Sequence, residues 1–336
     1  MIWNNVELFN VSEIKEQENG SLRVYRFTSK AREAFADGMR DYAVGVGEMT
    51  TGCEIRFVGE GADISLHCMH DNGSVEIYRG DFFVRRETIA QNSDHTVVLR
   101  SDLGTDRHNV SWYKGKYSTA VWRVVFGHDG TLSINSIKPV SDIRPPMAHE
   151  LPEKSVIAYG SSITHSACSV AYTNSYVYTL GRCLGAQMLC KGMGGSCFAQ
   201  RAVVDYVADQ PTDAALLELG INMVDTPIDV CEFERRAEYA VQRVLASGKK
   251  VILISNFTSH HNFSSGEYHE KNEQFVNKLE EIYERNKCDR LFYIKGSDVV
   301  SELSFLTADI LHPAPYGHIS MGHRIAERLK ELNFKL

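Results

Sequence analysis

The sequence lacks the long apolar runs that membrane proteins need. No stretch approaches the roughly 18 consecutive apolar residues that a bilayer-spanning helix requires. The segment from Met1 to Glu7 has no basic cluster, no apolar core and no small-residue cleavage site of the kind found in secretory signal peptides. We therefore expect a cytoplasmic protein without a membrane partner.

Positive charge and metal-binding patterns are also scarce. The formal net charge is −7, and no basic run is interleaved with aromatic residues, which argues against a nucleic-acid partner. None of the eight cysteines forms a C-x-x-C pair, and His269-Glu270 lacks the second histidine of a zincin helix. We expect reduced, mostly buried thiols, no metal and no cofactor. The oligomeric state stays open.

What the sequence does contain divides it into two parts. With 336 residues, 43% of them hydrophobic and 24% charged, the chain is long enough for two globular domains. Up to about residue 140, short segments of alternating polarity are separated by glycine-containing turns, which is typical of an all-β sandwich or jelly roll. We expect a hairpin between 121–126 and 131–137. The other strand-like segments are 53–58, 62–67, 74–79 and 81–89.

Residues 141–154 contain three prolines and show no clear periodicity, so we interpret them as an interdomain linker. From residue 155 onward, apolar segments of strand length alternate with segments of helical periodicity. This βαβ alternation predicts a doubly wound α/β domain over 155–336, with a parallel sheet whose ligands bind at the carboxyl ends of its strands. The predicted strands are 155–159, 187–191, 214–219, 250–256 and 290–295, and the predicted helices are 174–184, 199–208, 230–246, 268–286 and 321–332.

Small residues follow the first two of these strands. Residues 160–162 read Gly-Ser-Ser, so Ser162 stands at a strand end, at or near the start of a helix whose N–H groups and dipole favour negative charge. A serine that only caps the helix is the alternative. Residues 192–195 read Gly-Met-Gly-Gly, which lets backbone N–H groups approach a ligand closely. A dinucleotide-binding G-x-G-x-x-G does not fit, because residue 197 is cysteine.

Polar side chains follow at two later positions. Asn222, after the strand at 214–219, can donate a hydrogen bond into the same crevice, although an asparagine there is usually a turn residue. Asp309 precedes His312 by three residues, a spacing at which a carboxylate can reach an imidazole and fix its tautomer. The histidine could then act as a base toward a serine from elsewhere in the fold. A loop with incidental polar residues is the alternative.

In combination, these segments resemble the signature blocks of the SGNH (GDSL-like) hydrolase superfamily over about residues 155–332. Residues 160–164, Gly-Ser-Ser-Ile-Thr, resemble the nucleophile block G-D-S-I-T, with Ser161 in place of the aspartate. Residues 309–312 match the block D-x-x-H. The resemblance implies a flavodoxin-like fold and makes Ser162 the nucleophile.

The two middle blocks are matched less closely. Gly192 corresponds to the glycine of the second block, although the register could slip to Gly194. Residues 220–222 match G-x-N, with Met223 in place of the usual aspartate. The resemblance implies a Ser162–His312–Asp309 triad, in which His312 is the base, and an oxyanion hole formed by the backbone N–H groups of Ser162 and Gly192 and the amide of Asn222.

A β-sandwich ahead of such a domain resembles the two-domain carbohydrate esterases of family two, which remove O-acetyl groups from sugars. Those enzymes often lack the aspartate of the triad, whereas Asp309 is present here. The resemblance implies an acetylated oligosaccharide or a small-molecule ester as substrate. The alternatives are an acylhydrolase acting on lipids, thioesters or aryl esters, and a non-catalytic carbohydrate-binding protein.

Two further histidines follow the strand at 250–256. His260 and His261 would line the crevice at the carboxyl end of the sheet and could bind substrate there. Exposed loop histidines without a function are the alternative.

Overall fold

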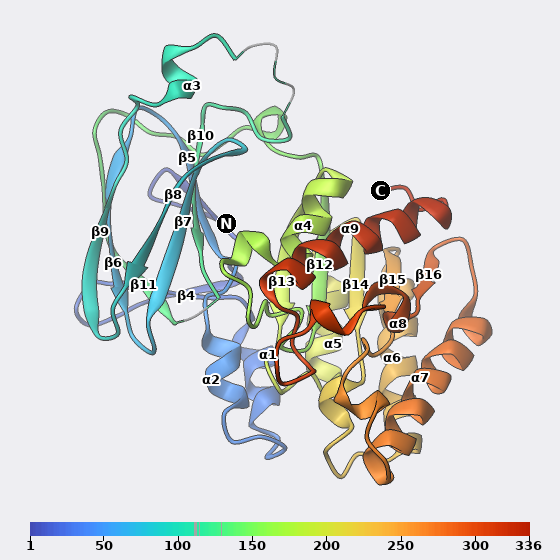
Figure 1. Ribbon diagram of the computed structural model, residues 1–336. Helices are drawn as coiled ribbons and strands as arrows, with labels where there is room; N and C mark the ends of the chain where they lie inside the picture. The colour runs from blue at the N-terminus through green and yellow to red at the C-terminus, as the bar shows by residue number, and fades with distance from the viewer. Residues whose placement is uncertain (111–112, 114, 129) are drawn as a thin grey trace. The chain divides into compact units, whose positions relative to one another are not determined.

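The computed structural model describes residues 1–110, 113, 115–128 and 130–336 (Figure 1). The chain forms two compact units. The first comprises Met1–Thr28, Glu48–Glu153 and Ala171–Thr173, and the second comprises Ser29–Gly47, Lys154–Val170 and Asn174–Leu336. The second unit therefore takes up residues 29–47, which lie inside the range 1–140 that the sequence assigned to the sandwich.

The first unit contains two antiparallel sheets. Side chains of alternate residues, such as Ile55 and Phe57 from one sheet and Ile64 and Leu66 from the other, meet in one buried apolar core. Alternation of this kind is what a half-buried strand requires, and it confirms the predicted sandwich. One sheet has the order β1 (Ile2–Trp3), β2 (Val6–Phe9), β5 (Glu54–Val58), β10 (Val121–Phe126), β7 (Gly73–Arg79), β8 (Phe82–Ile89), and the other β3 (Glu13–Glu16), β4 (Leu22–Tyr25), β11 (Leu132–Pro139), β6 (Ala62–Cys68), β9 (Ser93–Val98).

The expected hairpin between 121–126 and 131–137 is wrong. Strand β10 pairs with β5 and β7 in one sheet, whereas β11 pairs with β4 and β6 in the other. The turn between them therefore carries the chain from one sheet to the other. A glycine-containing turn predicts a reversal of direction, but it does not say which strand becomes the partner.

The stretch interpreted as a linker is fastened to the sandwich. The backbone N–H and carbonyl of Arg144 pair with those of Val58 at 3.1 and 2.8 Å, and its guanidinium binds both carboxylate oxygens of Glu150 at 2.7 and 2.8 Å. Residues up to Glu153 accordingly belong to the first unit.

The thiols are also less buried than expected. Four of the eight cysteines are buried, and the other four are exposed, namely Cys168, Cys183, Cys231 and Cys288. The expectation that they are mostly buried is therefore wrong.

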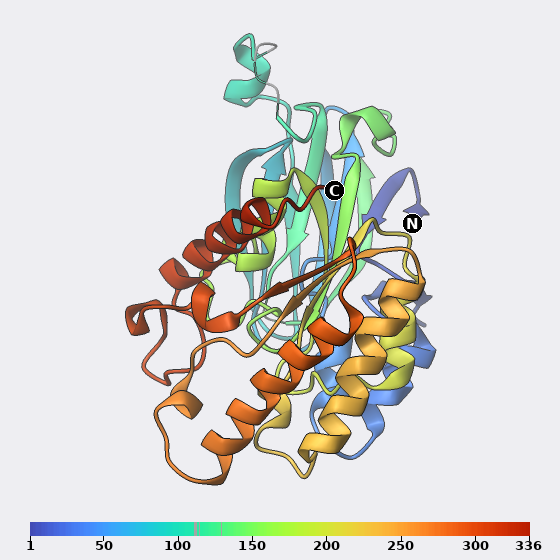
Figure 2. The ribbon, with the colours of Figure 1, turned by 90° about the vertical axis from the view of Figure 1, so that its right-hand side faces the viewer.

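The second unit is built on a five-stranded parallel sheet in the order 2-1-3-4-5, the flavodoxin-like arrangement, which confirms the predicted fold class. Helices cover both faces, with α4 and α9 on one side and α5, α6 and α7 on the other (Figure 2). The strands are β13 (Ala186–Gly192), β12 (Lys154–Gly160), β14 (Ala214–Glu218), β15 (Lys250–Ile254) and β16 (Leu291–Ile294), and the helices are α4 (Tyr176–Leu184), α5 (Arg201–Asp209), α6 (Val230–Ala246), α7 (Glu267–Asn286), α8 (Gly296–Val299) and α9 (Pro315–Glu331).

Local signals set the ends of these helices. Ser175 caps α4 by accepting the Tyr178 N–H at 3.2 Å, and Gly185 ends that helix with a left-handed φ of 65°. Asp229 caps α6 by accepting the Glu232 N–H at 2.8 Å.

Within the described residues, no helix is both long enough and apolar enough to cross a membrane.

The parallel register brings three strand ends to one edge of the sheet. Gly160 at the end of β12 pairs with Gly192 at the end of β13, and β14 ends alongside at Glu218. The loops that follow these strands therefore start next to one another, at the edge where ligands of such folds bind.

Candidate active site

The side chains of Ser162, His312 and Asp309 form a continuous chain of hydrogen bonds. The Oγ of Ser162 lies 2.8 Å from Nε2 of His312, and Nδ1 of His312 lies 2.6 Å from Oδ2 of Asp309. An ionised carboxylate can only accept, so Nδ1 carries a hydrogen and Nε2 is left to accept the hydrogen of the serine hydroxyl. This is the arrangement in which a histidine can activate a serine.

Asp309 is saturated with hydrogen bonds. Besides the imidazole, its carboxylate accepts the Thr307 hydroxyl at 2.7 Å and the N–H groups of Leu311 and His312 at 2.9 and 3.0 Å. Partial burial acts to raise the pKa of Asp309, but the bonds from His312, Thr307 and the backbone outweigh it and hold the pKa below the ordinary range. The side chain is 47% exposed, so its position is set by hydrogen bonds more than by enclosure.

His260 and His261 lie beside the loop that carries this aspartate. The His260 N–H donates to the carbonyl of Ile310 at 2.6 Å, and the two imidazole rings are 4.1 Å apart. His261 is buried, and its burial together with the neighbouring His260 lowers its pKa. The alternative of exposed loop histidines is therefore wrong for His261. A role of either histidine in binding substrate stays a prediction.

The segment around Ser162 is a turn. Residues 161–168 form successive turns, with the His165 N–H bound to the Ser161 carbonyl at 2.9 Å and the Ala167 N–H bound to that of Ser162 at 2.9 Å. The expected helix at this point is wrong, because α4 begins only at Tyr176. Stabilisation of negative charge here must come from individual N–H groups and not from a helix dipole.

The structure distinguishes the two glycines of the second block by their surroundings. A Cβ atom at Gly192 would lie 2.2 Å from the backbone nitrogen of His165, so this glycine is packed against the far end of the turn. A Cβ atom at Gly194 would lie 3.9 Å from Cβ of Ser162 and 3.5 Å from Nδ1 of His165. The loop glycine beside the candidate nucleophile is therefore Gly194.

Asn222 lies in the short 3₁₀ helix η4 (Ile221–Met223) that follows β14. Its Oδ1 accepts the N–H of Cys197 at 3.1 Å. This bond ties Asn222 to the loop that contains Gly194 and fixes the plane of the amide. The Nδ2 group is then the side of the amide that can donate to a substrate oxygen.

If Asn222 supplies an oxyanion donor, Asn222→Ala should lower kcat by about 10²–10³, the usual loss for one such donor, with little change in KM. Steady-state kinetics on a p-nitrophenyl ester would measure both constants. A large rise in KM at unchanged kcat would instead make Asn222 a ground-state substrate ligand.

Sequence reasoning missed the contribution of residues 29–47. They form α1 (Ser29–Glu33), the 3₁₀ helix η1 (Ala34–Ala36) and most of α2 (Ala43–Glu48). The ideal Cβ position at Gly194 is 3.9 Å from Val46, and that at Gly195 is 2.3 Å from the hydroxyl of Tyr42. Arg40 binds Asp225 at 2.8 Å, just after η4. No motif marks this insertion, because its role depends on contacts with loops far away in the sequence.

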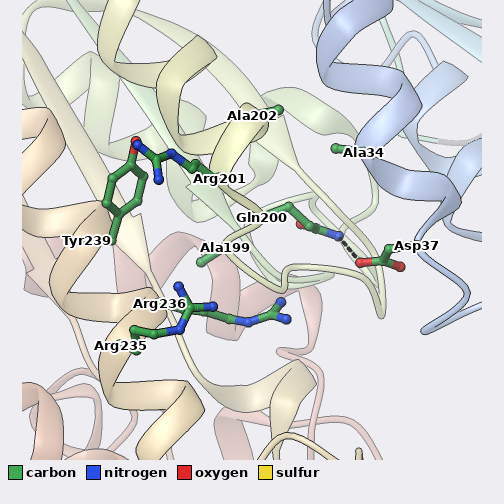
Figure 3. A pocket seen from close by; sticks show the side chains of 9 residues that line it. All are labelled: Ala34, Asp37, Ala199, Gln200, Arg201, Ala202, Arg235, Arg236 and Tyr239. Atoms are coloured by element: carbon green, nitrogen blue, oxygen red, sulfur yellow. Dashed lines mark hydrogen bonds between the residues drawn. The ribbon is translucent and has the colours of Figure 1, made fainter.

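A separate pocket of about 310 Å³ lies at the start of α5 (Figure 3). Its lining includes Arg235 and Arg236, but both guanidinium groups bind Glu232, at 2.7 and 2.6 Å. Arg236 also donates to the carbonyl of Phe198 at 2.9 Å, and Gln200 donates to Asp37 at 3.0 Å. These bonds brace the loop between Gly194 and α5, which is the loop that orients Asn222.

The model of the GDSL-like lipase/acylhydrolase family matches residues 153–330. No curated protein matches the chain. Among solved structures, the salicylyl-acyltransferase SsfX3 from a tetracycline biosynthetic pathway is similar with a TM-score of 0.77 and 13% identity, covering 98% of this chain and 95% of its own.

Two family two carbohydrate esterases are also similar in structure. The enzyme from Cellvibrio japonicus has a TM-score of 0.62 and 14% identity and covers 98% of this chain and 95% of its own. The enzyme from Clostridium thermocellum, solved in complex with cellohexaose, has a TM-score of 0.61 and 13% identity and covers 85% of this chain and 94% of its own. At such identities these likenesses establish the fold alone.

Proposed function

The chain belongs to the GDSL-like lipase/acylhydrolase family, and we propose that it hydrolyses O-acyl esters of carbohydrates, above all O-acetyl esters, through an acyl-enzyme on Ser162. The observation that carries this proposal is the hydrogen-bond chain from Asp309 through His312 to Ser162. The same three side chains would be unnecessary in a protein that only binds sugars.

The mechanism follows from these contacts. His312 takes the hydroxyl proton through Nε2 as Ser162 Oγ attacks the ester carbonyl, and Asp309 stabilises the imidazolium. The Ser162 N–H, the N–H of the loop glycine, here Gly194, and the Asn222 amide face the developing oxyanion. His312 then protonates the leaving alcohol, and a water molecule repeats the cycle on the acyl-enzyme, which releases the acid and restores the serine.

Two features support a small acyl group and a sugar alcohol. The ideal Cβ position at Gly194 is 3.9 Å from both Val46 Cγ1 and Ser162 Cβ, and an apolar side chain this near the nucleophile suits acetate better than a long chain. Tyr42 is 53% exposed and lies against Gly195, so its ring offers an apolar face of the kind on which sugars stack. Similarity to family two carbohydrate esterases agrees with this substrate class.

The substrate class can be tested with acetylated xylo- and cello-oligosaccharides and with p-nitrophenyl esters of rising chain length. We expect release of acetate from the sugars and a loss of about tenfold or more in kcat/KM for each methylene that does not fit. Val46→Ala is the matched variant, because it widens the space beside Gly194 and should shift the preference toward propionyl esters. Preference for long chains with no action on acetylated sugars would favour the lipid, thioester or aryl ester alternative.

A second candidate is acyl transfer to an alcohol instead of water. The likeness to SsfX3 over 98% of this chain motivates it, and the acyl-enzyme on Ser162 would be the same. Adding a sugar or phenol acceptor to the p-nitrophenyl acetate reaction and analysing the products by mass spectrometry separates the two. An acylated acceptor as the main product would identify a transferase, and free acetate an esterase.

A further inference from the structure

A buried carboxyl group lies directly beneath the turn that carries Ser162. Glu218 ends the central strand β14 and is fully buried. Its Oε2 accepts the N–H of Ser161 at 2.6 Å and the hydroxyl of Thr164 at 3.0 Å. These two groups stand immediately before Ser162 and two residues after it, so one oxygen atom spans the nucleophile position.

The surroundings of Glu218 are arranged for this contact. A Cβ atom at Gly160 would lie 2.5 Å from Oε2, so only glycine at this position lets the carboxyl group approach the turn. Thr164 Oγ1 is also 2.5 Å from the hydroxyl of Tyr176 on α4, which extends the network. Ser161 itself stands where the nucleophile block has an aspartate, so Glu218 brings a carboxyl group to the same turn from the neighbouring strand.

We propose that Glu218 is a positioning residue for Ser162, holding the Ser161 N–H and the Thr164 hydroxyl so that the N–H and Oγ of Ser162 keep their catalytic orientation. This proposal rests on the proposed function. Displacement of a reacting group by about 1 Å can cost on the order of 10² in rate, which is the scale of effect that loss of this anchor should have.

The carboxyl group is also placed to titrate near neutral pH. Burial raises the pKa of Glu218 to about 7, against the opposing effect of its bonds to Ser161 and Thr164. Its second oxygen, Oε1, is buried and accepts no hydrogen bond within the described part of the chain. Within the described residues, Tyr176 and Cys197 are titratable groups that interact with it, and burial raises the pKa of both, so they stay protonated while Glu218 ionises.

Ionisation of Glu218 lowers the stability of the folded chain. Because its pKa is raised in the folded chain, Glu218 contributes its stability while it is protonated, and this contribution declines as pH rises from about 4.5, the ordinary value, through about 7. The carboxylate, once formed, accepts the bonds from Ser161 and Thr164 more strongly than the neutral acid does. The reactivity of Ser162 should therefore rise as Glu218 ionises.

The test is the rate at which a fluorophosphonate labels Ser162 in the full-length protein between pH 5 and 9, followed by intact-mass spectrometry, with thermal unfolding measured in the same buffers. Glu218→Gln keeps an oxygen for both donors, so labelling at the plateau should stay within about tenfold of wild type. This variant should lose the rise in labelling rate that accompanies ionisation of Glu218, and it should also lose the decline in thermal stability between about pH 4.5 and 7. Glu218→Ala should label about 10²-fold more slowly while folded.

The control is Glu76→Gln. Glu76 is a fully buried glutamate of the first unit, its pKa is also raised by burial, and it accepts the N–H groups of Tyr172 and Thr173 at 3.1 and 2.8 Å. This variant should lower stability without changing the labelling profile.

Two outcomes would contradict the proposals in different ways. If folded Glu218→Gln shows wild-type labelling rates and a wild-type pH profile, the proposed role of Glu218 is overturned and the esterase proposal is not, even if Glu218→Ala does not fold. Absence of Ser162 labelling in the wild-type protein would overturn the esterase proposal and this one together.

Discussion

Ser162→Ala is expected to abolish ester hydrolysis while leaving the fold intact. The hydroxyl of Ser162 is the group that hydrogen-bonds to His312, so its removal leaves no nucleophile at the end of the triad. Loss of the serine from a complete triad costs on the order of 10⁶ in kcat, and the oxyanion donors and substrate binding account for what remains. Turnover of p-nitrophenyl acetate, with circular dichroism to verify folding, measures this.

Ser161→Ala is the matched control, since it removes the neighbouring hydroxyl. Ser161 is buried, and its Oγ accepts the Ile163 N–H at 3.2 Å, so it supports the turn without facing His312. Alanine keeps the backbone N–H that donates to Glu218 and loses only the additional side-chain bond from Ser161 to that carboxyl group. We expect most of the activity to survive. If Ser161→Ala is inactive and Ser162→Ala active, the nucleophile is one residue away from the one proposed.

The sequence predicted the parallel sheet well because its three central strands are mostly buried on both faces and its strands are bounded by polar turns. The segment 230–246 coincides with α6, and 155–159 differs from β12 by one residue at each end. The blocks around Ser162 and His312 were equally visible, since each is a short local pattern at a strand end or just before a helix. A local sequence pattern does not reveal which distant segments of the chain pack against these blocks.

The missed features share this dependence on distant contacts. The helices within residues 29–47 are too short to produce a recognisable helical periodicity in the sequence. That these residues lie beside Gly194 is seen only in the folded structure. In the sequence, Glu218 is only the last residue before the end of an apolar segment. Its contact with the Ser161 N–H depends on the neighbouring strand, which ends at Gly160. The choice between Gly192 and Gly194 depends on how the loop turns after β13, which spacing alone does not determine.

Asp309→Asn is expected to slow turnover by at least about a hundredfold. This is a lower bound, and the loss when a complete triad loses its carboxylate is roughly 10⁴ in kcat. The asparagine Oδ1 can still accept the Thr307 hydroxyl and the N–H groups of Leu311 and His312, so the loop should hold. The amide nitrogen would then face Nδ1 of His312 as a donor. The imidazole would be driven to carry its proton on Nε2, where it can no longer accept from Ser162.

The exposure of Asp309 makes this prediction a demanding one, because water could replace part of what a half-exposed carboxylate contributes. We expect that water does not replace it, because four hydrogen bonds hold the carboxylate in place and ionised, one of them to the imidazole at 2.6 Å. Steady-state kinetics should give a lower kcat for Asp309→Asn and a still lower one for His312→Ala. Asp309 should stay ionised on the acid side of the activity profile, because its hydrogen bonds hold its pKa below the ordinary range. Near wild-type kcat in Asp309→Asn beside an inactive His312→Ala would mean that Ser162 and His312 act as a dyad and that Asp309 only builds the loop.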